Sequence, residues 1–124
     1  MSAKDEVGQR RRWRRYHLTV PVRVTIEKFL HVSVIDGLSF KMSDGGLEVC
    51  ADTELRIGDK ANFEFKPPHF DRLTLRGVIR HHKGNFYGVE FLATSSRERE
   101  KLDRFRQVLR TTVGPFDGKR TLEH

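Results

Sequence analysis

The chain has 124 residues, and its 24 Lys and Arg against 17 Asp and Glu give a formal net charge of +7. That length suits one compact domain. The apolar runs fall far short of the roughly 20 residues that a membrane-spanning helix needs, and no apolar segment follows the basic N-terminus as in a secretory signal. The single cysteine, Cys50, excludes an internal disulfide and fits a reducing compartment. We therefore expect a cytoplasmic domain without membrane insertion.

The basic residues are concentrated near the N-terminus. Residues 1–30 contain eight basic and three acidic side chains, and five of the six residues from 10 to 15 are arginine, interrupted by Trp13. Arginine binds phosphates well because its planar guanidinium is always charged and donates to two oxygens at once. The cluster indicates an anion-binding segment, and a solvated basic tail is the alternative.

Alternating hydrophobicity predicts short strands after a flexible N-terminal segment, residues 1–9. Regular alternation covers residues 18–26, 47–51, 61–65, 73–79 and 87–91. The stretch between residues 29 and 43 alternates less regularly, and Asp36-Gly37 in its middle predicts a hairpin turn or a β-bulge. Further turns are expected at residues 43–46, 56–59 and 82–85.

The hydrophobic period changes near the end of the chain. Ser95 and Glu98 match a capping box at the start of a helix. A single apolar stripe follows at helical spacing, formed by Leu102, Phe105 and Leu109. The sequence therefore predicts a helix at about residues 95–111 that packs against the strands.

Several short strands separated by turns and followed by one helix favour an all-β barrel or sandwich at residues 10–112. Closing a barrel removes the strand edges that would otherwise be exposed. Residues 113–121 are expected to form a C-terminal tail. Residues 122–124 match the start of a purification tag and are excluded from functional reasoning.

The sequence contains no nucleophile elbow, phosphate-binding P-loop or His-Glu-x-x-His motif. His81 and His82 are adjacent, and neighbours in a strand point to opposite faces, so a hairpin-surface role is favoured over a metal site. Cys50 has no identifiable base beside it and is interpreted as a packed thiol. We expect no enzymatic activity, no metal and no cofactor.

Two features suit a small anionic ligand. Arg11 and Arg15 lie four residues apart in the arginine cluster. Their guanidinium groups can donate two hydrogen bonds to a phosphate, and the guanidinium planes can stack on purine rings. The hydroxyl of Ser43 and the backbone N–H groups beside Gly45 and Gly46 offer polar contacts at a turn. Together they suit a compact, doubly phosphorylated ligand with purine bases. An ordinary hairpin turn is the alternative for residues 43–46.

The order of these motifs resembles the PilZ domain family. Residues 11–22 (RRWRRYHLTVPV) resemble the family's opening Arg-x-x-x-Arg and the strand that follows it. Residues 41–46 (KMSDGG) fall on a second family motif, Asp/Asn-x-Ser/Ala-x-x-Gly. Segments 55–59, 75–79 and 87–91 also fit the family pattern, and the resemblance covers roughly residues 10–110.

The resemblance implies a six-stranded antiparallel, Greek-key-like β-barrel with a C-terminal α-helix. Its ligand would be cyclic di-GMP, a bacterial second messenger. Arg11 and Arg15 would grip the phosphates and stack on guanine, and Ser43 and Gly46 would line the guanine side. Arg10, directly before the first motif arginine, would reach a second stacked nucleotide.

Lys41 departs from the family pattern, because the first position of the second motif is usually Asp or Asn. An ammonium only donates, whereas a carboxylate or amide oxygen accepts from the N–H groups of guanine. Losing that acceptor costs about 1–3 kcal/mol, or roughly 5- to 150-fold in affinity. Lys41 is instead a candidate contact for a phosphate or for guanine O6, and Asp44 is an acidic candidate to compensate.

Three hypotheses follow. The first is a cyclic di-GMP receptor domain that signals when the ligand orders the arginine segment, a change read by a downstream protein partner. The second is a PilZ-like protein-interaction module that has lost nucleotide binding, motivated by Lys41. The third is a general nucleic-acid binder that uses the arginines and Trp13. The acidic residues spread over the strand segments argue against the broad basic face that this third hypothesis needs.

Overall fold

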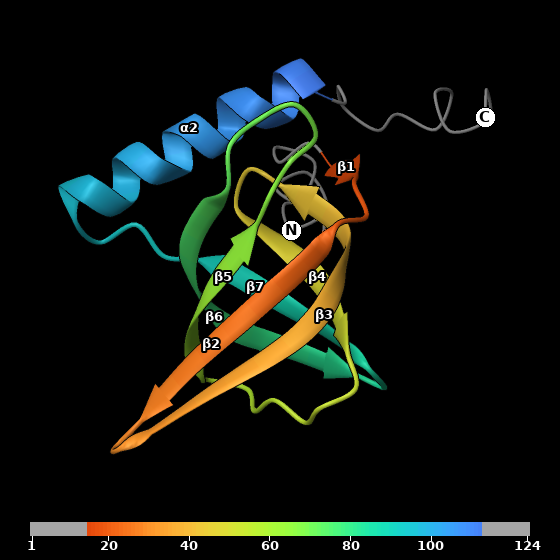
Figure 1. The fold of residues 1–124 in the computed structure, drawn as a ribbon, viewed down its shortest axis with the longest axis vertical. Coiled ribbons are helices and arrows are strands. Elements are labelled where there is room, and N and C mark those ends of the chain that lie inside the picture. The colour runs from red at the N-terminus through yellow and green to blue at the C-terminus, as the bar shows by residue number, and fades with distance from the viewer. Residues whose placement is uncertain (1–14, 113–124) are drawn as a thin grey trace, which may run out of the picture.

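The computed structural model describes residues 15–112, drawn in colour in Figure 1. Expectations for residues 1–14 and 113–124, including Arg10 and Arg11, lie outside the described residues. The described residues form seven strands and one helix, in the order β1 (Arg15–His17), β2 (Pro21–Lys28), β3 (His31–Ser43), β4 (Gly46–Ala51), β5 (Lys60–Phe65), β6 (Leu73–Lys83), β7 (Phe86–Phe91) and α2 (Ser96–Thr112).

Six of the seven strands form a closed antiparallel barrel. Along the sheet the order is β3-β2-β5-β6-β7-β4, and the pairing of β4 with β3 closes the ring. The connection from β4 to β5 skips the two strands between them, which gives the sheet its Greek-key-like order. β1 is the seventh strand and adds to the free side of β3 at residues 41–43. The predicted fold class, a six-stranded barrel with a C-terminal helix, is confirmed.

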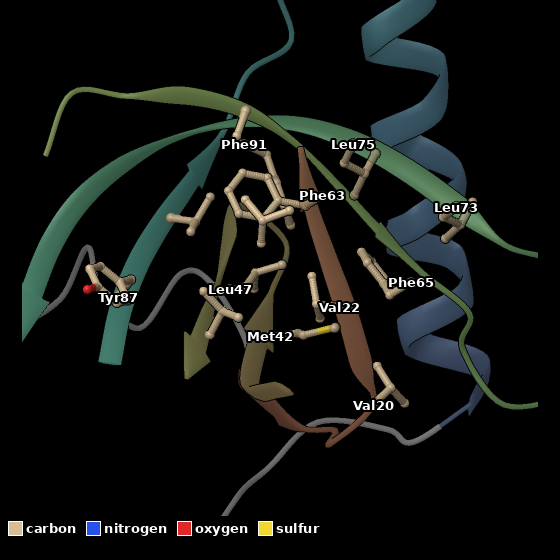
Figure 2. Packing of buried hydrophobic residues seen from close by; sticks show 14 of the residues in the cluster. Val20, Val22, Met42, Leu47, Phe63, Phe65, Leu73, Leu75, Tyr87 and Phe91 are labelled. Atoms are coloured by element: carbon tan, nitrogen blue, oxygen red, sulfur yellow. The ribbon is translucent and has the colours of Figure 1, made fainter. Parts of the chain in front are cut away.

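Alternation along the strands fills the barrel with apolar side chains. Val22 and Val24 on β2 and Phe63 and Phe65 on β5 are buried, with polar residues between them facing out. Figure 2 shows such side chains from several strands gathered inside the barrel. Ser39 is the buried polar residue among them, and its hydroxyl donates to the Leu18 carbonyl while accepting from the Val20 N–H. A buried hydroxyl without these partners would be costly.

α2 covers one end of the barrel (Figure 1). Its apolar stripe is buried, and the ring of Phe105 packs edge-on against Phe65 at 5.6 Å and Phe91 at 5.2 Å between centroids. Edge-to-face contacts of this kind add to the burial energy of aromatic side chains. Among residues 15–112, no helix is long and apolar enough to cross a membrane.

The helix begins with one hydrogen bond that the capping-box pattern predicts and with a return bond that comes from Thr94 instead of Ser95. The Glu98 N–H donates to Ser95 Oγ at 3.1 Å. In return, Glu98 Oε1 accepts from the backbone N–H and the hydroxyl of Thr94, both at 2.8 Å. The Thr94 backbone N–H is the main reason that the pKa of the Glu98 carboxyl is lowered. These contacts fix where the helix leaves β7.

The prediction of a turn or bulge at Asp36-Gly37 is wrong. Both residues lie inside the continuous strand β3, and the hairpin turn is at Phe29-Leu30, between the paired residues Lys28 and His31. Gly37 allows β3 and β4 to approach each other closely, because a Cβ at this position would lie 2.7 Å from the Cys50 carbonyl oxygen. The irregularity in β3 lies further along, between Ser39 and Lys41.

Candidate ligand-binding site

A cavity of about 580 Å³ lies where strands β3, β4, β6 and β7 meet α2. Its polar lining includes Lys41, Ser43, Glu48, His81, Glu90 and Arg106. The strand residues among these face outward, since their sequence neighbours such as Met42, Leu47 and Val89 are buried in the core. The cavity is therefore on the outside of the barrel, and its size is that of a typical small-molecule pocket.

β1 places the last residue of the first sequence motif beside the second motif. Arg15 is the register partner of Ser43, and His17 is the partner of Lys41. Between them, the side chain of Tyr16 is buried and anchors the strand in the core. The backbone of the last motif arginine is thus held beside the second motif, although the two lie far apart in sequence.

The second motif forms a tight turn at the cavity edge. Ser43 Oγ accepts from the Gly45 N–H at 3.3 Å and donates to the Gly46 carbonyl at 3.4 Å. Gly46 has no room for a side chain, because an added Cβ would lie 2.0 Å from the Val89 carbonyl oxygen. All three motif residues, Ser43, Gly45 and Gly46, line the cavity. The Ser43 hydroxyl and the Gly45 N–H are thus hydrogen-bonded within the turn, and the two glycines leave the backbone at the cavity edge without side chains.

Asp44 points toward α2. Its carbonyl oxygen accepts from Arg106 Nε at 3.1 Å, and its carboxylate lies 3.5 Å from Arg110 Nη2. The side chain is 15% exposed and does not line the cavity. Asp44 therefore joins the turn to the helix, and its carboxylate is not placed to replace the acceptor that Lys41 lacks.

Lys41 lines the cavity, but its ammonium is turned toward a neighbouring ring. Nζ lies 5.4 Å from the centroid of Phe40, within the range of a cation–π contact. The residue directly opposite Lys41 on β4 is Glu48. A basic and an acidic side chain therefore stand side by side on the outer face of the barrel.

A family model for the PilZ domain matches residues 9–107. The chain belongs to the PilZ domain family. The resemblance inferred from the sequence is thereby confirmed, over nearly the same residues. No curated protein matches the chain.

Solved structures of PilZ domains share the fold of this chain. The PilZ domain of CeSA from a cellulose-synthesizing bacterium is 16% identical with a TM-score of 0.61, covering 89% of this chain and 98% of its own. The PilZ domain of YcgR from Escherichia coli with cyclic di-GMP is 18% identical with a TM-score of 0.60, covering 82% and 92%. The Bacillus subtilis inhibitor of motility, MotI/DgrA, is 17% identical with a TM-score of 0.58, covering 93% and 53%.

The PilZ barrel also brings polar side chains to the cavity that the motifs did not indicate, among them Glu48, His81 and Arg106. These three residues come from β4, β6 and α2, respectively. The position of Glu48 beside Lys41 could have been predicted from the sequence. A two-residue turn that pairs residue 43 with residue 46 also pairs residue 41 with residue 48. No local pattern marks the other two, which reach the cavity through barrel closure and helix packing.

The cavity combines charges of both signs. Arg80 Nε donates to Glu90 Oε1 at 2.7 Å across the β6–β7 pair, so this carboxylate is neutralised. Lys41 and Arg106 add positive charge at the β3 and α2 sides. Within residues 15–112, no three His, Cys, Asp or Glu side chains are grouped so as to hold a metal ion. The arrangement suits a ligand with both anionic and hydrogen-bonding groups.

Proposed function

We propose that this PilZ domain binds cyclic di-GMP in the cavity and acts as a receptor without catalysis. The observation that carries the proposal is the register of β1, which places the backbone of Arg15 opposite Ser43 at the cavity edge. This register supports a site in which phosphate-binding arginines and the polar turn of the second motif act on one ligand. The similar PilZ domain of YcgR was solved with cyclic di-GMP.

Each motif has a distinct role in this proposal. Arg11 and Arg15 bind the phosphates and stack on guanine, while Ser43 and Gly46 line the base side. Arg10 extends the arginine set toward a second nucleotide. Ligand binding draws the arginine segment onto the barrel and so changes the surface beside β1, which a downstream protein partner reads.

Isothermal titration calorimetry with cyclic di-GMP tests the proposal. The wild-type domain should release or absorb heat on binding, and Arg11→Ala and Arg15→Ala should each weaken binding roughly 10- to 100-fold, as expected for a lost hydrogen bond to a charged group. Arg14→Ala is the matched control, since it removes the same charge from the same segment outside the motif spacing. Its effect should be several-fold smaller.

Two outcomes would overturn the proposal. Absence of binding at millimolar cyclic di-GMP would favour the PilZ-like interaction module without nucleotide binding, the alternative motivated by Lys41. Equal losses in Arg11→Ala, Arg14→Ala and Arg15→Ala, together with salt-dependent binding of any oligonucleotide, would favour general nucleic-acid binding instead.

A further inference from the structure

Glu48 is a half-buried carboxylate on the cavity wall. Within residues 15–112 it makes no hydrogen bond and no ion pair. The other carboxylate of the cavity, Glu90, is held by Arg80 at 2.7 Å. Partly removing a carboxylate from water without a partner is unfavourable. Glu48 is therefore the acidic group of the cavity that has acceptor capacity available for a ligand.

The surroundings of Glu48 form a row across four strands. In register, Lys41 on β3 lies opposite Glu48 on β4, Glu48 opposite Gly88 on β7, and Gly88 opposite His81 on β6. Directly opposed residues in antiparallel strands share one face of the sheet. The row therefore forms one continuous strip of the cavity floor.

Gly88 leaves the middle of this strip without a side chain, and the ring of His81 leans over it. A Cβ at Gly88 would lie 3.0 Å from His81 Cδ2 and 3.2 Å from His81 Cβ. The strip thus places a flat imidazole beside a carboxylate, with backbone between them. A planar heterocycle with donors along one edge fits such a surface.

We propose that Glu48 recognises the guanine base of the ligand, an inference that rests on the proposed binding of cyclic di-GMP. Guanine carries two adjacent donors, N1–H and the 2-amino group, and a carboxylate accepts both with its two oxygens. Adenine has an unprotonated N1 at the corresponding edge, whose lone pair a carboxylate repels. Glu48 therefore selects guanine over adenine and supplies the acceptor that an ammonium at position 41 does not.

Electrostatics orients the ligand along the cavity. The negative charge of Glu48 disfavours a phosphate beside it, and Lys41 on the same strip can donate to guanine O6, so the base lies over the strip and the phosphates lie at the other end. That end carries Arg106 and, through the register of β1, the backbone of Arg15 beside Ser43. Base recognition and phosphate binding are thus separated along the cavity.

The test compares three cyclic dinucleotides by calorimetry: cyclic di-GMP, cyclic di-AMP and cyclic di-IMP, whose hypoxanthine lacks the 2-amino group. Glu48→Ala should weaken binding of cyclic di-GMP roughly 10- to 100-fold. The affinity of the Glu48→Ala variant for cyclic di-AMP should be unchanged or higher, because the substitution removes a negative charge that repels the phosphates and adenine N1. Glu48→Gln keeps one acceptor and should retain binding of cyclic di-IMP better than that of cyclic di-GMP.

Glu64→Ala is the matched control. This residue is also a half-buried strand glutamate, but it lies on β5 outside the cavity and pairs with Arg72. It should leave all three affinities unchanged, and far-UV circular dichroism should show that each variant is folded.

The outcomes separate this inference from the proposed function. If the wild-type domain binds no cyclic di-GMP, both fail. If it binds and Glu48→Ala binds equally well, the inference alone fails. A uniform loss for all three dinucleotides in Glu48→Ala would also overturn it, because that pattern reports a change in the cavity and not in base recognition.

Discussion

β3 has a hairpin turn at each of its two ends, and the two turns differ in their surroundings. At one end, Asp44-Gly45 connects the paired residues Ser43 and Gly46 beside the cavity. At the other end, Phe29-Leu30 connects β2 and β3, and both side chains are fully exposed, at 105% and 99%. Figure 1 shows this second hairpin projecting away from α2. The two turns are equally short, so turn length does not explain the difference.

The difference comes from what packs around each turn. The Asp44 turn is held by two arginines of α2, and Gly46 lies against the β7 backbone. At the hairpin tip, residues 31–36 of β3 pair with β2 alone among the described strands, and Val32 and Val34 on this segment are exposed. Substitutions should therefore reduce stability strongly at the cavity end and weakly at the tip.

Phe105→Ala should give the largest loss of stability. The ring is fully buried between Phe65 and Phe91 and holds α2 on the barrel, so its removal should lower the free energy of unfolding by about 3–5 kcal/mol. Urea unfolding followed by circular dichroism measures this change. Leu30→Ala at the exposed tip is the control and should change stability by less than about 0.5 kcal/mol. Similar losses in both variants would contradict the contrast between the two ends.

Gly46→Ala should come next. The added Cβ meets the Val89 carbonyl oxygen at 2.0 Å, so β4 must move away from β7 at a cost of about 2–3 kcal/mol. Gly84→Ala in the β6–β7 turn is the control for backbone conformation. Gly84 has a φ of 62°, but an added Cβ there meets open space, so the variant measures the cost of the left-handed conformation without steric crowding. Its cost should be about 1 kcal/mol. If Gly84→Ala were the more destabilising of the two in urea unfolding, steric crowding would not be the constraint at Gly46.

The strands and the helix were largely predictable from the sequence, because alternation and the spacing of Leu102, Phe105 and Leu109 are local signals of burial. The hairpin at Phe29-Leu30 was missed because neither residue is typical of a turn. Asp36-Gly37 has typical turn chemistry, yet Gly37 is required by the close approach of β4. Tertiary packing overrode the local signal at both positions.

The candidate site was predictable only where its residues belong to contiguous motifs. Ser43, Gly45 and Gly46 were found as a turn, and the structure places all three at the cavity. Arg106 was not found, because its position depends on how α2 packs over the end of the barrel. A cavity assembled from four strands and a helix has no signature within one segment of sequence.

The helix start that connects α2 to the barrel should respond to pH. Because hydrogen bonds from Thr94 lower the pKa of Glu98 in the folded state, ionised Glu98 stabilises the fold above the pKa of the unfolded chain. This contribution is lost as the pH falls through the lowered folded pKa. Glu98→Gln should therefore cost at most about 1 kcal/mol at pH 7, because solvent screens the exposed carboxylate, and less below about pH 4. Glu100→Gln, an exposed residue of the same helix, should show no such pH dependence in urea unfolding from pH 7 to pH 3. A pH-independent cost for Glu98→Gln would show that its charge does not stabilise the helix start.

The smallest effect, and one of opposite sign, is expected at the tip. Phe29 has a φ of 53°, a left-handed conformation that costs an L-residue about 1–2 kcal/mol. Its ring is exposed, so burial of the ring contributes little stabilisation to offset this cost. Glycine removes that cost, but its greater conformational freedom in the unfolded chain lowers the free energy of unfolding by about 0.5–1 kcal/mol. Phe29→Gly should therefore stabilise the domain by about 0.5 kcal/mol in urea unfolding, the net of these two magnitudes.

Leu30→Gly is the neighbouring control for this last variant. Leu30 is equally exposed but has no positive φ, so glycine there brings the entropic cost without relief of strain and should destabilise slightly. If Phe29→Gly were destabilising to the same extent, the phenyl ring would have to support the hairpin through contacts. In that case the tip, like the Asp44 turn, would depend on side-chain packing, and the contrast between the two ends of β3 would be one of degree.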